Sequence, residues 1–394
     1  MAILLRCVLC CLCAVVLAAQ SPPSTSPSEQ PTPITVAQLR ALLASPQEDA
    51  ILAAHLNKLQ LTQRLGFTDL DRLRDALPGP GSRDALTVLA DRSIFLAAPP
   101  ASVPPAPDLS EQRRIMARTV DYVAAAMHKL PDFFATRTTL QFADWPGKLQ
   151  IGDKVSARDL PLAAQGTFTD TITYRKGAEI VSKRPARPSR HRKEQSTGLQ
   201  AWGVFGPILS IVLVDAAHGT AAWDRWELIG SSQPALVAVF RYTVAMKKST
   251  YSIKYCCMYG AGDYNTPIDR HTAYHGEIAV DPATGAILRI TVIADLGQGD
   301  TSQVLDEALH GEPLRQADLA VEYGPVSIGG ITYICPTHSI ALSRVRTQIS
   351  MGAYPDRIYF AGPIRTYLND VTFTDYHLFR SEMRILPADP AQNP

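Results

Sequence analysis

The residues best suited to acid–base or metal chemistry lie between Asp269 and Glu277. This stretch of nine residues holds two histidines, His271 and His275, and a carboxylate at each end. Imidazole and carboxylate groups are ligands that zinc accepts. However, the spacing is not the helical His-Glu-x-x-His of zinc hydrolases, and the pattern is that of a loop running into a strand. We therefore expect polar surface residues and predict no metal site. A secreted hydrolase, possibly metal-dependent and centred on His271, His275 and Glu277, is the alternative.

Three cysteines remain once the predicted signal peptide removes four of the seven: Cys256, Cys257 and Cys335. They form no Cys-x-x-Cys motif, and no further Cys or His lies at zinc-finger spacing. In an oxidising compartment we expect one disulfide. Cys257 shares the apolar phase of its strand with Tyr255, and Cys335 shares that of Tyr333, so we predict a Cys257–Cys335 bridge. Cys256 becomes the partner if a bulge follows Tyr255.

Four aromatic residues lie close together in sequence, around an apolar stretch at 205–217. They are Trp202, Phe205, Trp223 and Trp226. Such side chains either line a cavity for a lipid or another hydrophobic ligand, or simply belong to the core.

Other familiar signatures of chemistry are missing from the sequence. There is no Gly-x-Ser-x-Gly elbow, no P-loop and no dinucleotide-binding fingerprint. We predict no catalytic residue and no cofactor. The stretch 183–193 holds six Lys or Arg among eleven residues. It is interpreted as a solvated loop, with anionic lipid, polysaccharide or nucleic acid as alternative contacts.

The first nineteen residues indicate the compartment. Arg6 precedes an apolar run at 7–17, and Ala18 and Ala19 suit signal peptidase. We expect an exported protein, periplasmic or extracellular, cleaved near Gln20. Losing Arg6 leaves 37 of the 38 basic residues against 37 acidic ones. This balance argues against a dedicated nucleic-acid binder. No later stretch is long and apolar enough for a transmembrane anchor.

Helical signals dominate the residues after the leader at 20–33. A capping box at Thr35 to Gln38, a helix from Pro46 to Gly66, and short helices at 68–77 and 82–92 predict a helical bundle at 34–96. A proline-rich linker follows at 97–107.

The main domain is predicted at 108–387, before a tail at 388–394. A helix begins at Asp108 and ends at Pro131, and the apolar stretch at 205–217 predicts a buried helix. Alternating apolar residues then predict antiparallel strands. These strands are expected at 167–174, 236–244, 251–255, 274–281, 286–294, 319–328, 331–335 and 371–385.

Two resemblances follow from these segments. Residues 129–137, 274–290 and 321–336 resemble a family of exported proteins of acidobacterial-type bacteria, a resemblance that implies no known activity. The turn Asp281-Pro-Ala-Thr-Gly285 and the Gly329-Gly330 hairpin are similar to those of periplasmic lipoprotein carriers and of the anti-sigma regulator RseB. That similarity implies a curved antiparallel sheet.

Together these features predict an α+β protein. It has an N-terminal helical bundle, then a curved antiparallel β-sheet domain with one or two packed helices. The expected function is non-catalytic binding of a hydrophobic small molecule or an envelope protein partner, because no catalytic constellation is present.

Overall fold

The computed structural model describes residues 31–144, 161–180, 198–199, 201, 203–229, 234–259, 264–296, 314–351 and 358–379. The predicted signal peptide, most of the leader, the basic stretch at 183–193, Trp202 and the C-terminal tail lie outside the described residues. In the described part of the chain, no helix is long and apolar enough to cross a membrane.

The N-terminal region combines helices with a small sheet. Its elements are β1 (Thr32–Ile34), α1 (Val36–Leu43), α2 (Asp49–Leu56), β2 (Leu59–Leu61), α3 (Phe67–Asp75) and α4 (Pro80–Ser93). The predicted capping box is confirmed, because the Thr35 side chain accepts from the Gln38 N–H and Gln38 accepts from the Thr35 N–H. β1 and β2 pair in parallel. The end of the expected leader is therefore part of this small sheet.

The predicted helix from Pro46 to Gly66 is wrong at both ends. α2 begins only at Asp49, and its carboxylate caps α4 instead, accepting from Gly81 N at 3.1 Å and Ser82 N at 2.8 Å. The C-terminal half of the predicted helix becomes β2, whose two leucines are buried. Pairing with β1 outweighs local helix propensity here.

Two further helices follow the proline-rich segment, as expected. α5 (Leu109–Lys129) begins after Asp108, whose carboxylate accepts from the Glu111 N–H at 2.8 Å. α6 (Pro207–His218) confirms the predicted apolar helix, and a single 3₁₀ turn covers Met246–Lys248. The segment 97–107 between α4 and α5 has no regular secondary structure.

A ten-stranded antiparallel sheet forms most of the remaining chain, in the order β5-β4-β3-β15-β14-β13-β12-β11-β8-β7. Its strands are β3 (Phe133–Ala143), β4 (Ala163–Arg175), β5 (Ala178–Ile180), β7 (Thr220–Ile229), β8 (Ala235–Val244), β11 (Ala273–Val280), β12 (Ile287–Asp295), β13 (Leu314–Ile328), β14 (Ile331–Met351) and β15 (Ile358–Leu378). A second sheet, in the order β10-β9-β6, consists of β6 (Gly198–Leu199), β9 (Ser252–Tyr259) and β10 (Tyr264–His271).

Both predicted turns are present. Gly329 and Gly330 have φ of 61° and 86°, the positive values that a tight two-residue hairpin needs. Gly285, with φ of 78°, ends the turn after β11. A Cβ atom at Gly285 would lie 2.4 Å from the Arg118 carbonyl oxygen, so α5 packs directly on this turn.

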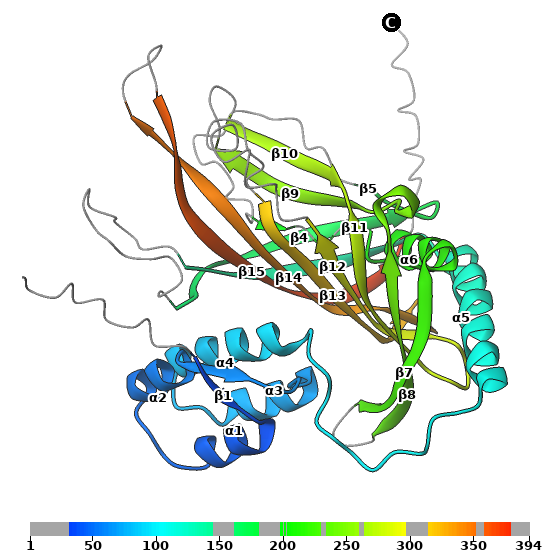
Figure 1. Ribbon diagram of the computed structural model, residues 1–394, viewed down its shortest axis with the longest axis horizontal. Coiled ribbons are helices and arrows are strands. Elements are labelled where there is room, and N and C mark those ends of the chain that lie inside the picture. Colours follow the sequence, from blue (N-terminus) through cyan, green and yellow to red (C-terminus); the bar gives the residue numbers. More distant parts are fainter. Residues whose placement is uncertain are drawn as a thin grey trace, which may run out of the picture. The chain divides into compact units, whose positions relative to one another are not determined.

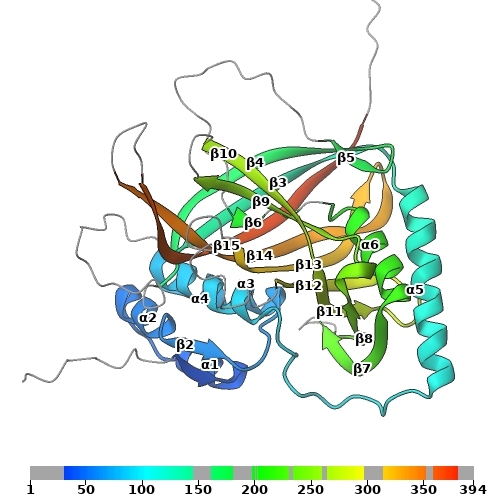
Figure 2. The same ribbon diagram turned by 45° about the horizontal axis from the view of Figure 1, so that its top comes forward.

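The large sheet carries a different cover on each face. Along β14, Ala341 and Val345 belong to the large core cluster that also includes residues of α5, α6 and the second sheet, while Ile340 and Leu342 belong to a separate cluster with Val88 of α4. Figures 1 and 2 show α5 and α6 beside each other on one side of the sheet and α1–α4 grouped on the other. The N-terminal region also has a hydrophobic cluster of its own.

Candidate functional site

The residues predicted as the alternative hydrolase centre do not converge. His271 is exposed at the end of β10, and His275 Nδ1 lies 2.9 Å from Asp295 Oδ1 on the surface. Glu277 instead accepts two hydrogen bonds of 2.9 Å from Arg225. Among the described residues, no group of three or more His, Cys, Asp or Glu side chains is arranged to hold a metal ion.

Glu277 belongs to a buried ion-pair network that the sequence analysis missed. Glu227 on β7 pairs with Arg64 from the N-terminal region and, at 2.8 Å, with Arg289 on β12. The three side chains are only 2–4% exposed. Burial alone would raise the pKa of Glu277, but the hydrogen bonds and charge of Arg225 lower it overall. The network joins the N-terminal region to the sheet.

The predicted aromatic cluster is divided between two places. Phe205 is fully buried, with its ring 5.4 Å from that of Phe133 and 5.3 Å from that of Phe373. Trp223 and Trp226 on β7 contact each other at 4.8 Å between ring centroids. Trp226 also donates from Nε1 to the Pro105 carbonyl oxygen at 3.0 Å, which fastens the proline-rich segment. Of these three side chains, Phe205 borders a cavity.

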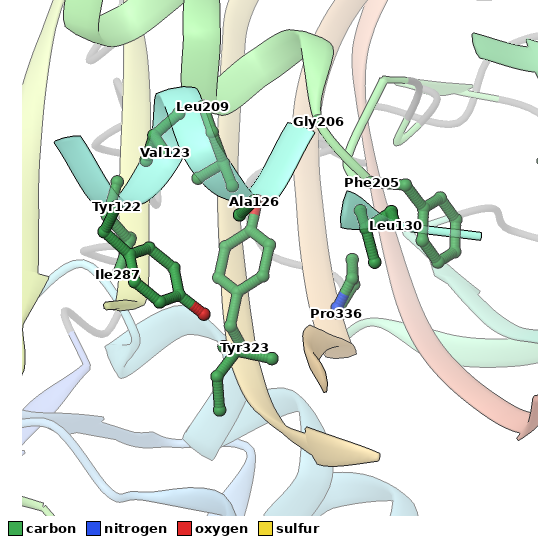
Figure 3. A pocket seen from close by; sticks show the side chains of 11 residues that line it. Tyr122, Val123, Ala126, Leu130, Phe205, Gly206, Leu209, Ile287, Tyr323 and Pro336 are labelled. Carbon is green, nitrogen blue, oxygen red and sulfur yellow. The ribbon is translucent and has the colours of Figure 1, made fainter. Parts of the chain in front are cut away.

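This cavity lies between α5, α6 and strands β12–β14 (Figure 3). Its volume is about 20 Å³, room for roughly one water molecule. Within the described part of the chain, no charged side chain lines it. The lining residues are Tyr122, Val123, Ala126, Leu130, Phe205, Gly206, Leu209, Ile287, Tyr323, Ile334 and Pro336.

The polar groups around this cavity are neutral. The Tyr323 hydroxyl donates to the Val204 carbonyl oxygen at 3.0 Å. Burial raises the pKa of the Cys335 thiol to about 12. Burial and the nearby Cys335 also raise the pKa of Tyr122. These groups therefore stay protonated at neutral pH, and the cavity suits an uncharged, apolar molecule rather than an ion.

Cys335 is a buried free thiol in the structure. The side chains of Cys256 and Cys257 lie outside the described residues. The backbone of Cys256 pairs with Gly198, beside Ser343 of β14. Ser343 and Cys335 are eight positions apart on that strand, or about 26 Å at the usual rise. This register does not favour the expected bridge, and the pairing stays a prediction.

The sequence pattern predicts only part of the ion-pair network. The alternation of β7 shows that Arg225 and Glu227 share a strand face, but nothing in one sequence names their partners on other strands. The arrangement can therefore stabilise a fold through buried charge pairs and enclose an apolar group beneath two helices. In the comparisons with known proteins, no family model, curated protein or solved structure matches the chain.

Proposed function

We propose that this chain is an exported, non-catalytic binding protein that holds a hydrophobic ligand between α5, α6 and the large sheet. The observation that carries the proposal is the cavity with its uncharged lining. Apolar walls with a few tyrosine hydroxyls are typical of sites for hydrophobic small molecules. We also propose that the N-terminal region is a helical bundle and that the large sheet is curved. The resemblance to periplasmic lipoprotein carriers supports the curved sheet.

Ligand entry requires α5 to move, because a cavity of about 20 Å³ is far smaller than a lipid chain. The attachment of α5 is compatible with such a movement. Among the side chains of α5 that the structure describes, the buried ones, Ile115, Thr119 and Val123, lie on one face. The segment before it is extended and is held through Trp226 and through the hydrogen bond of Gln112 to the Pro107 carbonyl oxygen.

The proposal is tested with a fluorescent apolar probe such as N-phenyl-1-naphthylamine and the full mature chain. Ala126 lines the cavity, whereas Ala124 is exposed on the same helix. We expect Ala126→Trp to fill the cavity and reduce probe binding at least about tenfold, a loss of about 1.4 kcal/mol. Ala124→Trp adds the same ring on the solvent side and is expected to bind as the original chain does. Equal binding by both variants would contradict the proposal.

An envelope protein partner is the second candidate. Leu109 and Val120 are exposed on α5 and lie eleven positions apart, which places them on the same side of the helix. Native mass spectrometry of protein purified from its own host distinguishes a bound small molecule from a bound protein. The hydrolase alternative is not proposed, because His275 is held by Asp295 and Glu277 by Arg225.

Export is proposed on the signal-peptide pattern alone. N-terminal sequencing of the secreted or periplasmic protein is expected to begin within a few residues of Gln20. Recovery of a chain that keeps Met1 in the cytosol would contradict it.

A further inference from the structure

One carboxylate beneath the N-terminal helices is buried without a hydrogen-bond partner among the described residues. Asp91 of α4 has a relative exposure of 0%. Within the described part of the chain, neither of its carboxylate oxygens is paired. Asp91 follows Val88 by three positions, so both lie on the face of α4 that packs against the sheet. An ionised carboxylate in this position is very unfavourable.

The groups that face Asp91 include a second buried acid. Asp370 on β15 lies opposite Ile340 in the register of β14 and β15, and its carboxylate pairs with His338 on β14. The ring of Phe67, the first residue of α3, makes an edge contact with the His338 ring at 3.5 Å between centroids.

Among the other charged groups near Asp91, Arg74 of α3 is the cation that favours its ionised form. Arg92, its neighbour on α4, lies near Arg344 and Asp144 instead. Burial first, and then the charge of Asp370, raise the pKa of Asp91 well above its ordinary value of 3.8, and Arg74 opposes them. Compared with an exposed carboxyl group, the folded chain therefore favours the protonated form of Asp91.

The contact that contains Asp91 has a smaller hydrophobic cluster than the N-terminal region itself. The N-terminal region has its own hydrophobic cluster, and a smaller cluster joins α4 to Ile340, Leu342 and Leu368. Interfaces between separable parts of a chain are generally more polar than cores. The segment 97–107 that follows α4 has no regular secondary structure, so it does not fix α4 to the sheet by itself.

We infer that α4 packs against the sheet with Asp91 protonated, so that this contact is a pH-dependent latch that loosens as the pH rises. Between pH 3.8 and the raised pKa of Asp91, the closed contact binds up to one proton more than the open one. As the pH rises from 3.8 to the raised pKa of Asp91, the open state is increasingly favoured. Above that pKa the opening equilibrium no longer changes with pH. Burial lowers the pKa of the Arg64 guanidinium, but an arginine is not deprotonated in proteins, so its ion pair does not produce the same dependence.

The latch is tested by the reactivity of a cysteine introduced beneath α4 in the full mature chain. Val88→Cys places a thiol at a buried position that faces the sheet, and Val103→Cys places one at an exposed position in the proline-rich segment. Alkylation of each variant is measured by peptide mass spectrometry, and the rate at position 103 corrects for the pH dependence of thiol chemistry. Between about pH 4 and about pH 7 we expect the corrected rate at position 88 to rise by up to about tenfold per pH unit.

Two further variants decide which group carries the proton. In an Asp91→Asn background we expect the corrected rate to change less than about twofold over the same range, because the amide cannot ionise. Asp69→Asn, at the surface of α3, is the matched control and is expected to keep the full dependence. A flat profile in the unmodified background would overturn the inference. So would a pH dependence that survives Asp91→Asn but disappears in His338→Gln, since the proton would then lie on the histidine.

Discussion

The two faces of the large sheet are held by different kinds of interaction. Beneath α5 and α6 the contacts are mostly apolar and aromatic, and the thiol of Cys335 remains neutral. The exception is the buried Asp215 carboxylate of α6, which accepts hydrogen bonds from Thr250 and Tyr274. Beneath α4 the apolar cluster is small, and buried acids, a histidine and arginines lie around it. The first face depends mainly on buried area, which changes little with pH. The second face depends on charge pairing and on protonation, so we expect its stability to change with pH.

Breaking the charge network on the N-terminal side should have the largest effect. Glu227→Ala leaves the buried guanidinium groups of Arg64 and Arg289 without their shared carboxylate. We expect the free energy of unfolding to fall by about 4–5 kcal/mol, as measured by urea denaturation. Asp69→Ala removes an exposed pair with Arg40 and is expected to cost less than about 1 kcal/mol. Similar losses in both variants would show that burial of the network is unimportant.

Removing an aromatic ring from the opposite face should cost slightly less. Phe205→Ala deletes a fully buried ring that lies against four other aromatic residues, Phe133, Tyr174, Phe373 and Tyr376. We expect a loss of about 3–4 kcal/mol in unfolding free energy. The loss should differ little between about pH 5 and about pH 8, because the ring carries no charge and the hydrogen bond from the Phe205 N–H to Glu179 does not involve the deleted side chain. A loss that depends on pH would contradict the difference between the two faces.

A glycine-to-alanine substitution should destabilise the protein more in the turn beneath α5 than in a turn with open space around it. Gly285 and Gly177 have nearly equal φ, 78° and 79°, but of the two only Gly285 has backbone, the Arg118 carbonyl, where a Cβ would lie. Gly285→Ala is expected to cost about 2–3 kcal/mol, and Gly177→Ala about 1 kcal/mol. Urea denaturation of the two variants measures the difference. If both variants lost the same unfolding free energy, α5 would be able to move away from this turn at no energetic cost.

Adding a reducing agent should have the smallest effect on stability. If Cys335 is a free thiol, as the structure has it, a reducing agent should leave the midpoint of thermal unfolding unchanged. Peptide mapping without reduction should then recover Cys335 alkylated after unfolding. Recovery of Cys335 linked to Cys257 or Cys256 would support the bridge expected from the sequence, and would require a different register beside β14.

Local signals predicted much of this fold. The cap at Thr35, the helix after Asp108, the apolar helix at 207–218 and the Gly329–Gly330 hairpin each depend on a few neighbouring residues, and all are present. The helix expected from Pro46 was wrong because the second half of that segment pairs with a strand 27 positions earlier. Such pairing depends on tertiary contacts that a local pattern does not contain.

The candidate sites were harder to predict for the same reason. Asp91 follows three apolar or small residues in a helix and resembles an ordinary solvent-facing charge in the sequence. Only the position of α4 on the sheet places it beside Asp370. Likewise Phe205 was recognised as a candidate lining residue, but Tyr323 and Ile334 of the same cavity come from distant strands.

The order of strands also determines when this chain can fold. β3 lies between β4 and β15, so one of the earliest strands of the large sheet is completed by the last. The hydrogen bond from Gln141 to Asn369 spans 228 residues. Loops of this length make such contacts entropically costly to close, and proteins rich in them fold slowly. A nascent chain that lacks residues 358–378 leaves β3 and β14 with unpaired edges, so the large sheet is assembled only after nearly the whole chain has been synthesised.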